Sequence, residues 1–204
     1  MMSSPDSDRR QMRTERRLLK IRSVLRHRQA DLTVVLENIH DPHNVSAILR
    51  SADAVGMMEV QLVYTMEEFP SIGKKSSASA SKWVPRRKFL TIQDCYSKLR
   101  KEGFKIYASQ LDSQSLQLFD LDLRSKIALV FGNEHRGVSD EAAAMADGRF
   151  MIPMYGMIES LNVSVACAVT LFEALRQRLG QGHYSKPKLS SPAIRRLVEE
   201  WSKK

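Results

Sequence analysis

Apolar positions along the chain follow two patterns, short continuous runs and longer stretches with helical spacing. Continuous aliphatic runs predict strands at 31–38, 60–64, 104–108, 127–131 and 149–153. Helical spacing between these runs predicts helices at 44–54, 91–102 and 161–179, with a short helix after Ser139. Strands alternating with helices are typical of an α/β fold with a mostly parallel sheet and helices on both faces.

In two stretches the apolar residues show neither strand-like nor helical spacing. Residues 65–88 contain a Ser/Ala/Lys-rich patch at 74–82, which predicts a flexible surface loop. Residues 113–123 are expected to be a plain connecting segment. The pattern does not specify the order of the strands in the sheet.

The two ends of the chain differ from the middle and predict three regions. Residues 1–30 form a basic helical extension, 31–180 form the α/β domain and 181–204 form a second basic helical extension. The last helix is expected to begin at Ser191 and Pro192, by the preference for serine at the cap and proline in the first turn.

Charge mapping supports this division. The 204 residues include 32 Lys and Arg against 23 Asp and Glu, a formal net charge of +9. Residues 1–30 carry nine basic and three acidic side chains, residues 176–204 carry eight and two, and residues 31–175 carry 15 and 18. Two basic ends around a slightly acidic middle predict a polyanionic partner, and nucleic acid is favoured over a membrane because residues 1–30 contain no aromatic side chain.

Basic side chains of these ends, together with Lys82 from the middle of the chain, are the candidate RNA contacts. They are Arg9, Arg10, Arg13, Arg16, Arg17, Lys82, Lys186, Lys188, Arg195 and Arg196.

Several other classes of protein are disfavoured. No apolar run approaches the roughly 18 residues that span a bilayer, and the N-terminus lacks the apolar segment of a secretory signal. The only cysteines, Cys95 and Cys167, form no CxxC motif, so a cytoplasmic protein without disulfides is expected. His40, Asp41 and His43 lack a fourth ligand with suitable spacing, so no metal is expected.

Polar clusters follow three of the predicted strands, at 37–44, 132–137 and 152–164. Ligands of open parallel sheets bind beyond the carboxyl ends of strands, so these clusters are candidate binding loops. Their glycines match neither a dinucleotide GxGxxG loop nor a GK[ST] phosphate loop. The sequence contains no GxSxG motif, which disfavours a hydrolase with a catalytic triad. Taken singly, Asn44 could be a helix cap and Glu134 could cap a turn.

Taken together, the clusters resemble the three motifs of the SpoU branch of the SPOUT RNA methyltransferases. The motifs read NVSAILRSADAVG at 44–56, ALVFGNEHRGVS at 128–139 and MIPMYGMIESLNVSVACAV at 151–169. Within that branch, the opening from His27 is most similar to enzymes that methylate the ribose of guanosine 18 in tRNA. One departure is Ser79, where the family usually has glycine.

The resemblance implies a C-terminal trefoil knot, S-adenosylmethionine as methyl donor, tRNA as substrate and a homodimer. The long helix 161–179 is expected to contribute to the dimer, because it is apolar on more than one face and contains the small residues Ala166, Ala168 and Ala174. Methylation of rRNA or of another tRNA position remains an alternative. So does an RNA-binding protein of the same fold that does not catalyse a reaction.

The resemblance also assigns site residues. The catalytic set is Asn44, Arg50, Glu134, Ser160 and Asn162. Arg50 either loses a proton with help from an RNA phosphate or stays cationic, clamps a phosphate and stabilises charge on the 2′-oxygen; arginine's strong basicity favours the second role. The cofactor-binding set is Ser109, Phe131, Gly132, Asn133, Gly137, Ile152, Pro153, Met154, Ser160 and Leu161.

Overall fold

A seven-stranded sheet forms the centre of the protein, and every pairing between its strands is parallel. The computed structural model describes residues 5–66, 68–70 and 80–204, with side chains from Thr14 onward. The strand order is β3-β2-β1-β6-β4-β7-β5. The strands are β1 Leu32–Glu37, β2 Val60–Val63, β3 Arg86–Phe89, β4 Lys105–Ser109, β5 Leu116–Gln117, β6 Ile127–Phe131 and β7 Gly148–Met151.

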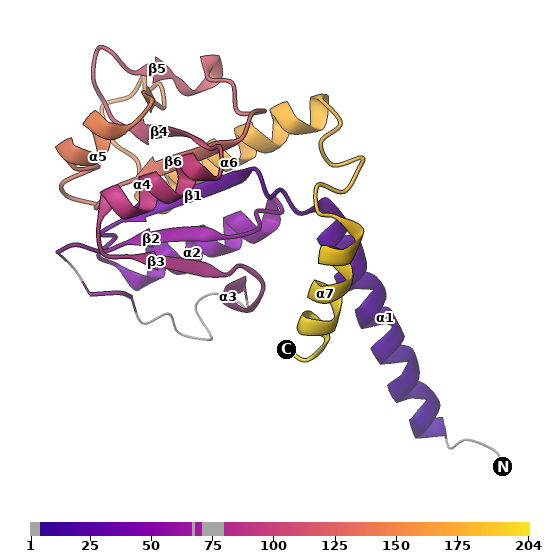
Figure 1. The fold of residues 1–204 in the computed structure, drawn as a ribbon. Coiled ribbons are helices and arrows are strands. Elements are labelled where there is room, and N and C mark those ends of the chain that lie inside the picture. The colour runs from indigo at the N-terminus through magenta and orange to yellow at the C-terminus, as the bar shows by residue number, and fades with distance from the viewer. Residues whose placement is uncertain (1–4, 67, 71–79) are drawn as a thin grey trace.

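Helices cover both faces of this sheet, as the sequence predicts (Figure 1). The helices are α1 Pro5–His27, α2 Pro42–Ala54, α3 Ala80–Trp83, α4 Ile92–Lys101, α5 Asp140–Met145, α6 Val163–Gly180 and α7 Ser191–Ser202, with a 3₁₀ turn at Leu118–Asp120. One face packs against α2 and α6 and the other against α4 and α5. The prediction of a parallel α/β fold is therefore confirmed.

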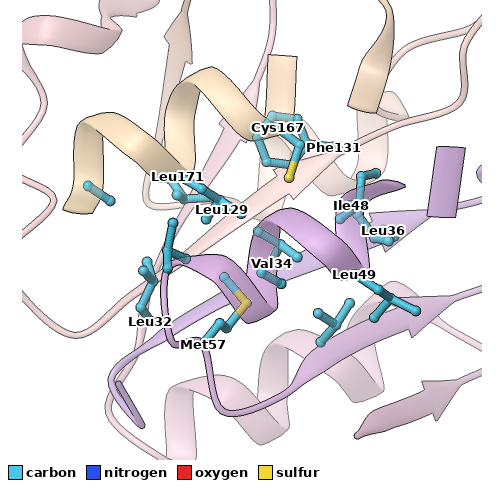
Figure 2. Packing of buried hydrophobic residues seen from close by; sticks show 14 of the residues in the cluster. Leu32, Val34, Leu36, Ile48, Leu49, Met57, Leu129, Phe131, Cys167 and Leu171 are labelled. Carbon is cyan, nitrogen blue, oxygen red and sulfur yellow. The ribbon is translucent and has the colours of Figure 1, made fainter. Parts of the chain in front are cut away.

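The larger core lies between the sheet and the pair of helices α2 and α6 (Figure 2). Val34 of β1 and Leu129 of β6 point toward Ile48 of α2 and Leu171 of α6, and all four side chains are fully buried. β1 and β6 are buried along their whole length, which explains their continuous aliphatic runs. Leu36 of β1 pairs with Phe131 of β6, so the loops that follow these two strands begin side by side at one edge of the sheet.

Two strands were missed by the pattern, as were the short helix α3 and the 3₁₀ turn. β3 pairs in parallel with β2 along its whole length, but its sequence RRKF is basic and half exposed, as an edge strand of the sheet tolerates. β5 has only two residues, too few to show a period. Of the patch at 74–82, residues 74–79 lie outside the described residues and Ala80–Lys82 belong to α3.

Three of the expected helix starts are shifted, and that of α6 moves from residue 161 to Val163. Asp41 caps α2 by accepting a hydrogen bond from the backbone N–H of His43, so Asn44 lies inside the helix and its side chain is available for other contacts. Ser190, and not Ser191, caps α7 by accepting from the N–H of Ala193.

The terminal helices α1 and α7 pack against each other beside the α/β domain (Figure 1). Ile21 and Leu25 of α1 contact Leu197 and Trp201 of α7 in a small core of their own, with α3's Trp83 packed against it. The two basic ends of the sequence therefore form one helical unit.

Asp31 links the segment before α7 to the domain, together with Arg178 at the end of α6. The Arg178 guanidinium is fully buried and donates to Asp31 Oδ1 at 2.6 Å and to the backbone oxygens of Leu123 and Ser125. Lys188 donates to the other carboxylate oxygen of Asp31 and lies 2.9 Å from His183 Nδ1. Burial opposes ionisation of Asp31, but these two cations outweigh it and hold the pKa of the carboxyl below its ordinary value.

Candidate active site

Glu134 lies in the loop after β6 and accepts hydrogen bonds from the chain that leads into α2. Its Oε2 accepts from the N–H of His40 at 2.9 Å, and its Oε1 accepts from the N–H of Asp41 at 3.2 Å and from Asn44 Nδ2 at 2.8 Å. Partial burial opposes ionisation, but the hydrogen bonds lower the pKa of Glu134 below its ordinary value. The carboxylate therefore acts as an ionised acceptor that ties two loops together.

A second link joins the loop before α6 to the same residues. Asn162 Nδ2 donates to Asn44 Oδ1 at 3.1 Å, while Asn162 Oδ1 caps α6 by accepting from the N–H of Ser164 at 2.9 Å. Glu134, Asn44 and Asn162 thus form one hydrogen-bonded chain, referred to below as the Glu–Asn–Asn chain. It brings together residues from three separate segments of the sequence.

Two glycines shape the loop that carries Glu134. A Cβ on Gly132 would lie 2.0 Å from the carbonyl oxygen of Gly137, so no side chain fits at position 132. Gly137 has φ +69°, which favours glycine. Asn133 closes the loop by accepting at Oδ1 from the N–H groups of His135 and Arg136 and by donating to Asn38 O.

A cavity of about 510 Å³ opens beside the Glu–Asn–Asn chain. A narrower hollow of about 160 Å³ continues from it and shares five lining residues with it, namely Ser109, Phe131, Ser160, Leu161 and Ala166. Their combined size is in the range of small-molecule sites, roughly 300–1,000 Å³. Loops after β4, β6 and β7 form the walls, so the cavity lies at the carboxyl edge of the sheet.

Nearly all the residues expected to bind a cofactor line these two hollows. They are Ser109, Phe131, Gly132, Asn133, Gly137, Ile152, Met154, Ser160 and Leu161. Pro153 is the exception, since it lines neither hollow. Sequence reasoning missed Gln110, which lines the narrower hollow and whose Oε1 is buried without a hydrogen-bond partner among the described residues.

These walls fit an adenosine cofactor. Apolar side chains of Phe131, Ile152 and Leu161 offer contacts for a flat base, and the backbone groups of the glycine loop offer hydrogen bonds for polar atoms. The unpartnered Gln110 Oε1 is an acceptor suited to an N–H group of such a ligand.

Arg50 lies away from the cavity. It is exposed on α2, about two turns after Asn44, and lines neither hollow. Within the described part of the chain, its guanidinium has no hydrogen-bond or ion-pair partner. The structure therefore brings Asn44, Glu134, Ser160 and Asn162 to the cavity region and leaves Arg50 free to meet another molecule.

The candidate RNA contacts separate into three groups. Exposed side chains are Arg16, Arg17, Lys82, Lys186, Arg195 and Arg196. Lys188 is instead paired with Asp31, and the side chains of Arg9, Arg10 and Arg13 lie outside the described ones.

Neither a membrane span nor a metal centre is found among the described residues. None of the helices described is both long and apolar enough to cross a bilayer. In the same part of the chain, His, Cys, Asp and Glu side chains form no group of three or more suited to a metal ion. Both cysteines are buried and free.

Comparison with known proteins agrees with this geometry. A tRNA (guanosine(18)-2′-O)-methyltransferase of Thermus thermophilus is 45% identical over 192 residues, covering 94% of this chain and 98% of the relative. The crystal structure of the Aquifex aeolicus TrmH/SpoU tRNA modifying enzyme superposes with a TM-score of 0.88 at 38% identity, covering 93% of this chain and 96% of that chain.

A more distant structure contains the cofactor. The SpoU methyltransferase AviRb of Streptomyces viridochromogenes, solved in complex with S-adenosylmethionine, has a TM-score of 0.65 at 26% identity, covering 74% of this chain and 59% of that chain. The model of the SpoU rRNA Methylase family matches residues 31–172, which include all three segments of the Glu–Asn–Asn chain. The chain belongs to the SpoU rRNA Methylase family.

Proposed function

We propose that this protein transfers a methyl group from S-adenosylmethionine to the ribose 2′-hydroxyl of guanosine 18 in tRNA. The observation that carries the proposal is the Glu–Asn–Asn chain at the mouth of a cavity suited to adenosine. The near full-length similarity to a guanosine-18 methyltransferase supports the choice of nucleotide.

In this proposal the cavity residues hold the cofactor and the Glu–Asn–Asn chain keeps its walls in place. When bound, S-adenosylmethionine supplies the methyl group that the ribose oxygen accepts. Glu134 and Asn162 fix the two loops on either side of the cavity, and Asn44 joins them. Ser160 lines both hollows and is exposed, so its hydroxyl can contact the ribose or the cofactor.

Arg50 would act on the RNA. Its exposed guanidinium offers a planar pair of N–H groups that matches a phosphate, and the same charge stabilises the negative charge that develops on the 2′-oxygen. We favour this cationic role over that of a base because a guanidinium holds its proton strongly.

The protein would act as a homodimer through α6. Val165, Val169 and Phe172 are 46%, 36% and 50% exposed and lie on one stripe of the helix. Ala174, expected to permit close approach of a partner, is instead fully buried in the core. A second copy would cover the exposed stripe and bring its own Arg50 toward this cavity.

The proposal also includes the C-terminal trefoil knot that the resemblance implies.

Residues 1–30 and 181–204 would be RNA-binding extensions of the methyltransferase domain at 31–180. Six exposed cations on or near the helical unit support this role. We place the enzyme in the cytoplasm, where its tRNA substrate is available and its two cysteines stay reduced.

Mapping the methylated nucleotide tests the function. The protein is incubated with S-adenosylmethionine and an unmodified tRNA transcript, and 2′-O-methyl nucleotides are located by mass spectrometry of nuclease fragments. The expected product is a single 2′-O-methylguanosine at position 18, absent when that nucleotide is 2′-deoxy. Methylation of an rRNA fragment or of another tRNA position in place of guanosine 18 would establish the alternative substrate, and binding without methylation would establish a non-catalytic protein.

A further inference from the structure

A third cavity, of about 310 Å³, lies far from the candidate cofactor site, between the helical unit and the domain. It is referred to below as the tryptophan pocket. Residues from α1, α2, α3 and α7 line it, together with Arg28 just after α1; the helical ones are Arg17, Lys20, Ile21, Val24, Asp53, Trp83 and Trp201.

The tryptophan pocket combines aromatic rings with cations. The rings of Trp83 and Trp201 lie 5.1 Å apart at an angle of 50°. Trp83 is partly exposed, so one aromatic surface is available to a ligand. Arg17 and Lys20 are exposed on the same face of α1, one turn apart, and place positive charge at the rim.

Arg28 forms a polar part of the pocket wall and is fully buried. Its Nη1 donates to Met57 O at 2.7 Å and its Nη2 to Asp53 Oδ1 at 2.5 Å, but its Nε is buried without a hydrogen-bond partner among the described residues. The Arg28 guanidinium carbon also lies 5.2 Å from the centroid of the Trp201 ring, so Arg28 holds this part of the wall in place.

The tryptophan pocket is also close to Arg50. Its wall residue Asp53 follows Arg50 by three positions on α2, so the two side chains are neighbours about one helical turn apart. RNA bound to Arg50 would therefore lie within about one helical turn of a residue of the pocket wall.

We propose that the tryptophan pocket is a subsite for one unstacked nucleotide of the RNA substrate, near the nucleotide held at Arg50. The base stacks on Trp83, and the backbone phosphate contacts Arg17 and Lys20. Aromatic surface beside cations is the combination that proteins use for single-stranded nucleotides. This inference rests on the proposed action on RNA, and it adds a specific contact that the basic charge of the ends does not by itself provide.

Intrinsic fluorescence tests the subsite directly. The chain has two tryptophans, and both line this pocket, so tryptophan emission reports on its occupancy. An unmodified tRNA transcript is titrated into the full-length protein, and emission is corrected for absorption by the RNA. We expect saturable quenching. Unchanged emission at saturating tRNA would overturn the proposal.

Matched variants separate the pocket from general charge attraction. Arg17→Gln is expected to weaken tRNA binding about tenfold and to reduce the quenching, whereas Arg26→Gln removes the same charge from an exposed position of the same helix outside the pocket and should have little effect. Equal losses in the two variants would contradict a specific subsite.

Trp83→Leu keeps apolar volume but removes the stacking ring. We expect tRNA affinity to fall about tenfold while S-adenosylmethionine affinity, measured by calorimetry, stays unchanged. Unchanged tRNA affinity in a folded Trp83→Leu variant would also overturn the proposal; if this variant does not fold, the quenching and the Arg17→Gln comparison decide. Methylation mapping of the wild type is a separate readout, so loss of the proposed function and loss of the subsite are distinguishable.

Discussion

Single side chains at the candidate site join separate segments of the fold, and the proposed function gives the same side chains a part in the chemistry. Asn162 ends the loop after β7 as the cap of α6 and also donates to Asn44. Glu134 accepts two backbone N–H groups before α2 as well as the Asn44 amide. Replacing any of these residues would therefore change both loop position and catalysis. Arg50 is different, because it has no structural partner among the described residues.

Arg50→Ala should consequently separate catalysis from cofactor binding. We expect methyl transfer to fall at least about 100-fold, because charge stabilisation at the 2′-oxygen is lost. S-adenosylmethionine affinity should stay unchanged, because Arg50 lines neither hollow. Arg50→Lys should also be slow, since a point charge does not replace a planar pair of donors. Single-turnover assays and calorimetric titration measure the two effects.

The control for this experiment is Arg26→Ala, which removes an exposed arginine from α1 and should transfer methyl groups at the wild-type rate. Near-normal single-turnover rates in Arg50→Ala would show that another group activates the ribose.

Gly132→Ala should disrupt the cofactor loop. The added Cβ would lie 2.0 Å from Gly137 O, so the loop must move. We expect S-adenosylmethionine affinity to fall at least about tenfold. Gly156→Ala is the matched control, because a Cβ at position 156 meets no atom within 4 Å. Calorimetry measures affinity, and thermal melts show whether each variant folds; equal affinity in both variants would contradict the predicted loop movement.

Among the elements, α6 has two apolar faces with different roles. Cys167, Leu171 and Ala174 point into the core, whereas Val165, Val169 and Phe172 face outward. A helix that only covered a sheet would need one such face. The second face accounts for the proposed dimer.

Phe172→Glu should produce a monomer at micromolar concentration, because a carboxylate in an apolar contact would be desolvated without a partner. Sedimentation velocity measures the change. Lys101→Glu introduces the same group on α4, which covers the opposite face of the sheet, and should leave a dimer. A dimeric Phe172→Glu variant would place the interface elsewhere.

The junction between the helical unit and the domain should respond to pH. Burial, with the charges of Lys188 and Arg178, lowers the pKa of His183 below its ordinary value. Between this lowered pKa and about 6.5, His183 therefore binds more protons in the unfolded chain than in the folded chain. The free energy of unfolding consequently decreases as the pH falls through this range. His183→Gln should reduce this decrease, as measured by urea unfolding at pH 7.5 and at lower pH; an unchanged pH dependence would contradict the assignment.

The elements also show what the sequence pattern could and could not predict. β1 and β6 were found because strands buried on both faces must be apolar throughout. β3 was missed because an exposed edge tolerates basic residues, and the sheet order depends on contacts between distant segments. Most of the residues that the resemblance assigns to the cofactor line the two hollows of the candidate site. Neither Gln110 nor the tryptophan pocket has a local signal in the sequence, since their environment is formed by residues far apart in the chain.

On the scale of the whole molecule, the excess of positive charge lies in the two ends of the chain, residues 1–30 and 176–204. Not all of it is available to RNA, because Arg28 and Arg178 are buried and Lys188 is paired with Asp31. The exposed part is the part expected to contact phosphates.

Salt dependence tests this division. For the wild type, a plot of the logarithm of the tRNA binding constant against the logarithm of the salt concentration should have a slope on the order of −4 to −6. Neutralising Arg16, Arg195 and Arg196 to glutamine should make the slope shallower by about 2 to 3 and leave the fold intact, since all three are exposed. Glutamine at Lys101 and Lys105, exposed on the domain, should leave the slope unchanged. Equal slopes in all three proteins would mean that the helical unit does not contact RNA.

The strand order finally determines when each part of the sheet can form during synthesis. β1, β2 and β3 come from one stretch and can pair early, but β4 pairs only with β6 and β7, and β5 only with β7. As the chain leaves the ribosome, one edge of β1 and one of β4 stay unpaired until residues 127–131 have been made, and the other edge of β4 stays unpaired until residues 148–151 follow. Unpaired edges recruit other chains, so the nascent protein is most prone to aggregation in this interval.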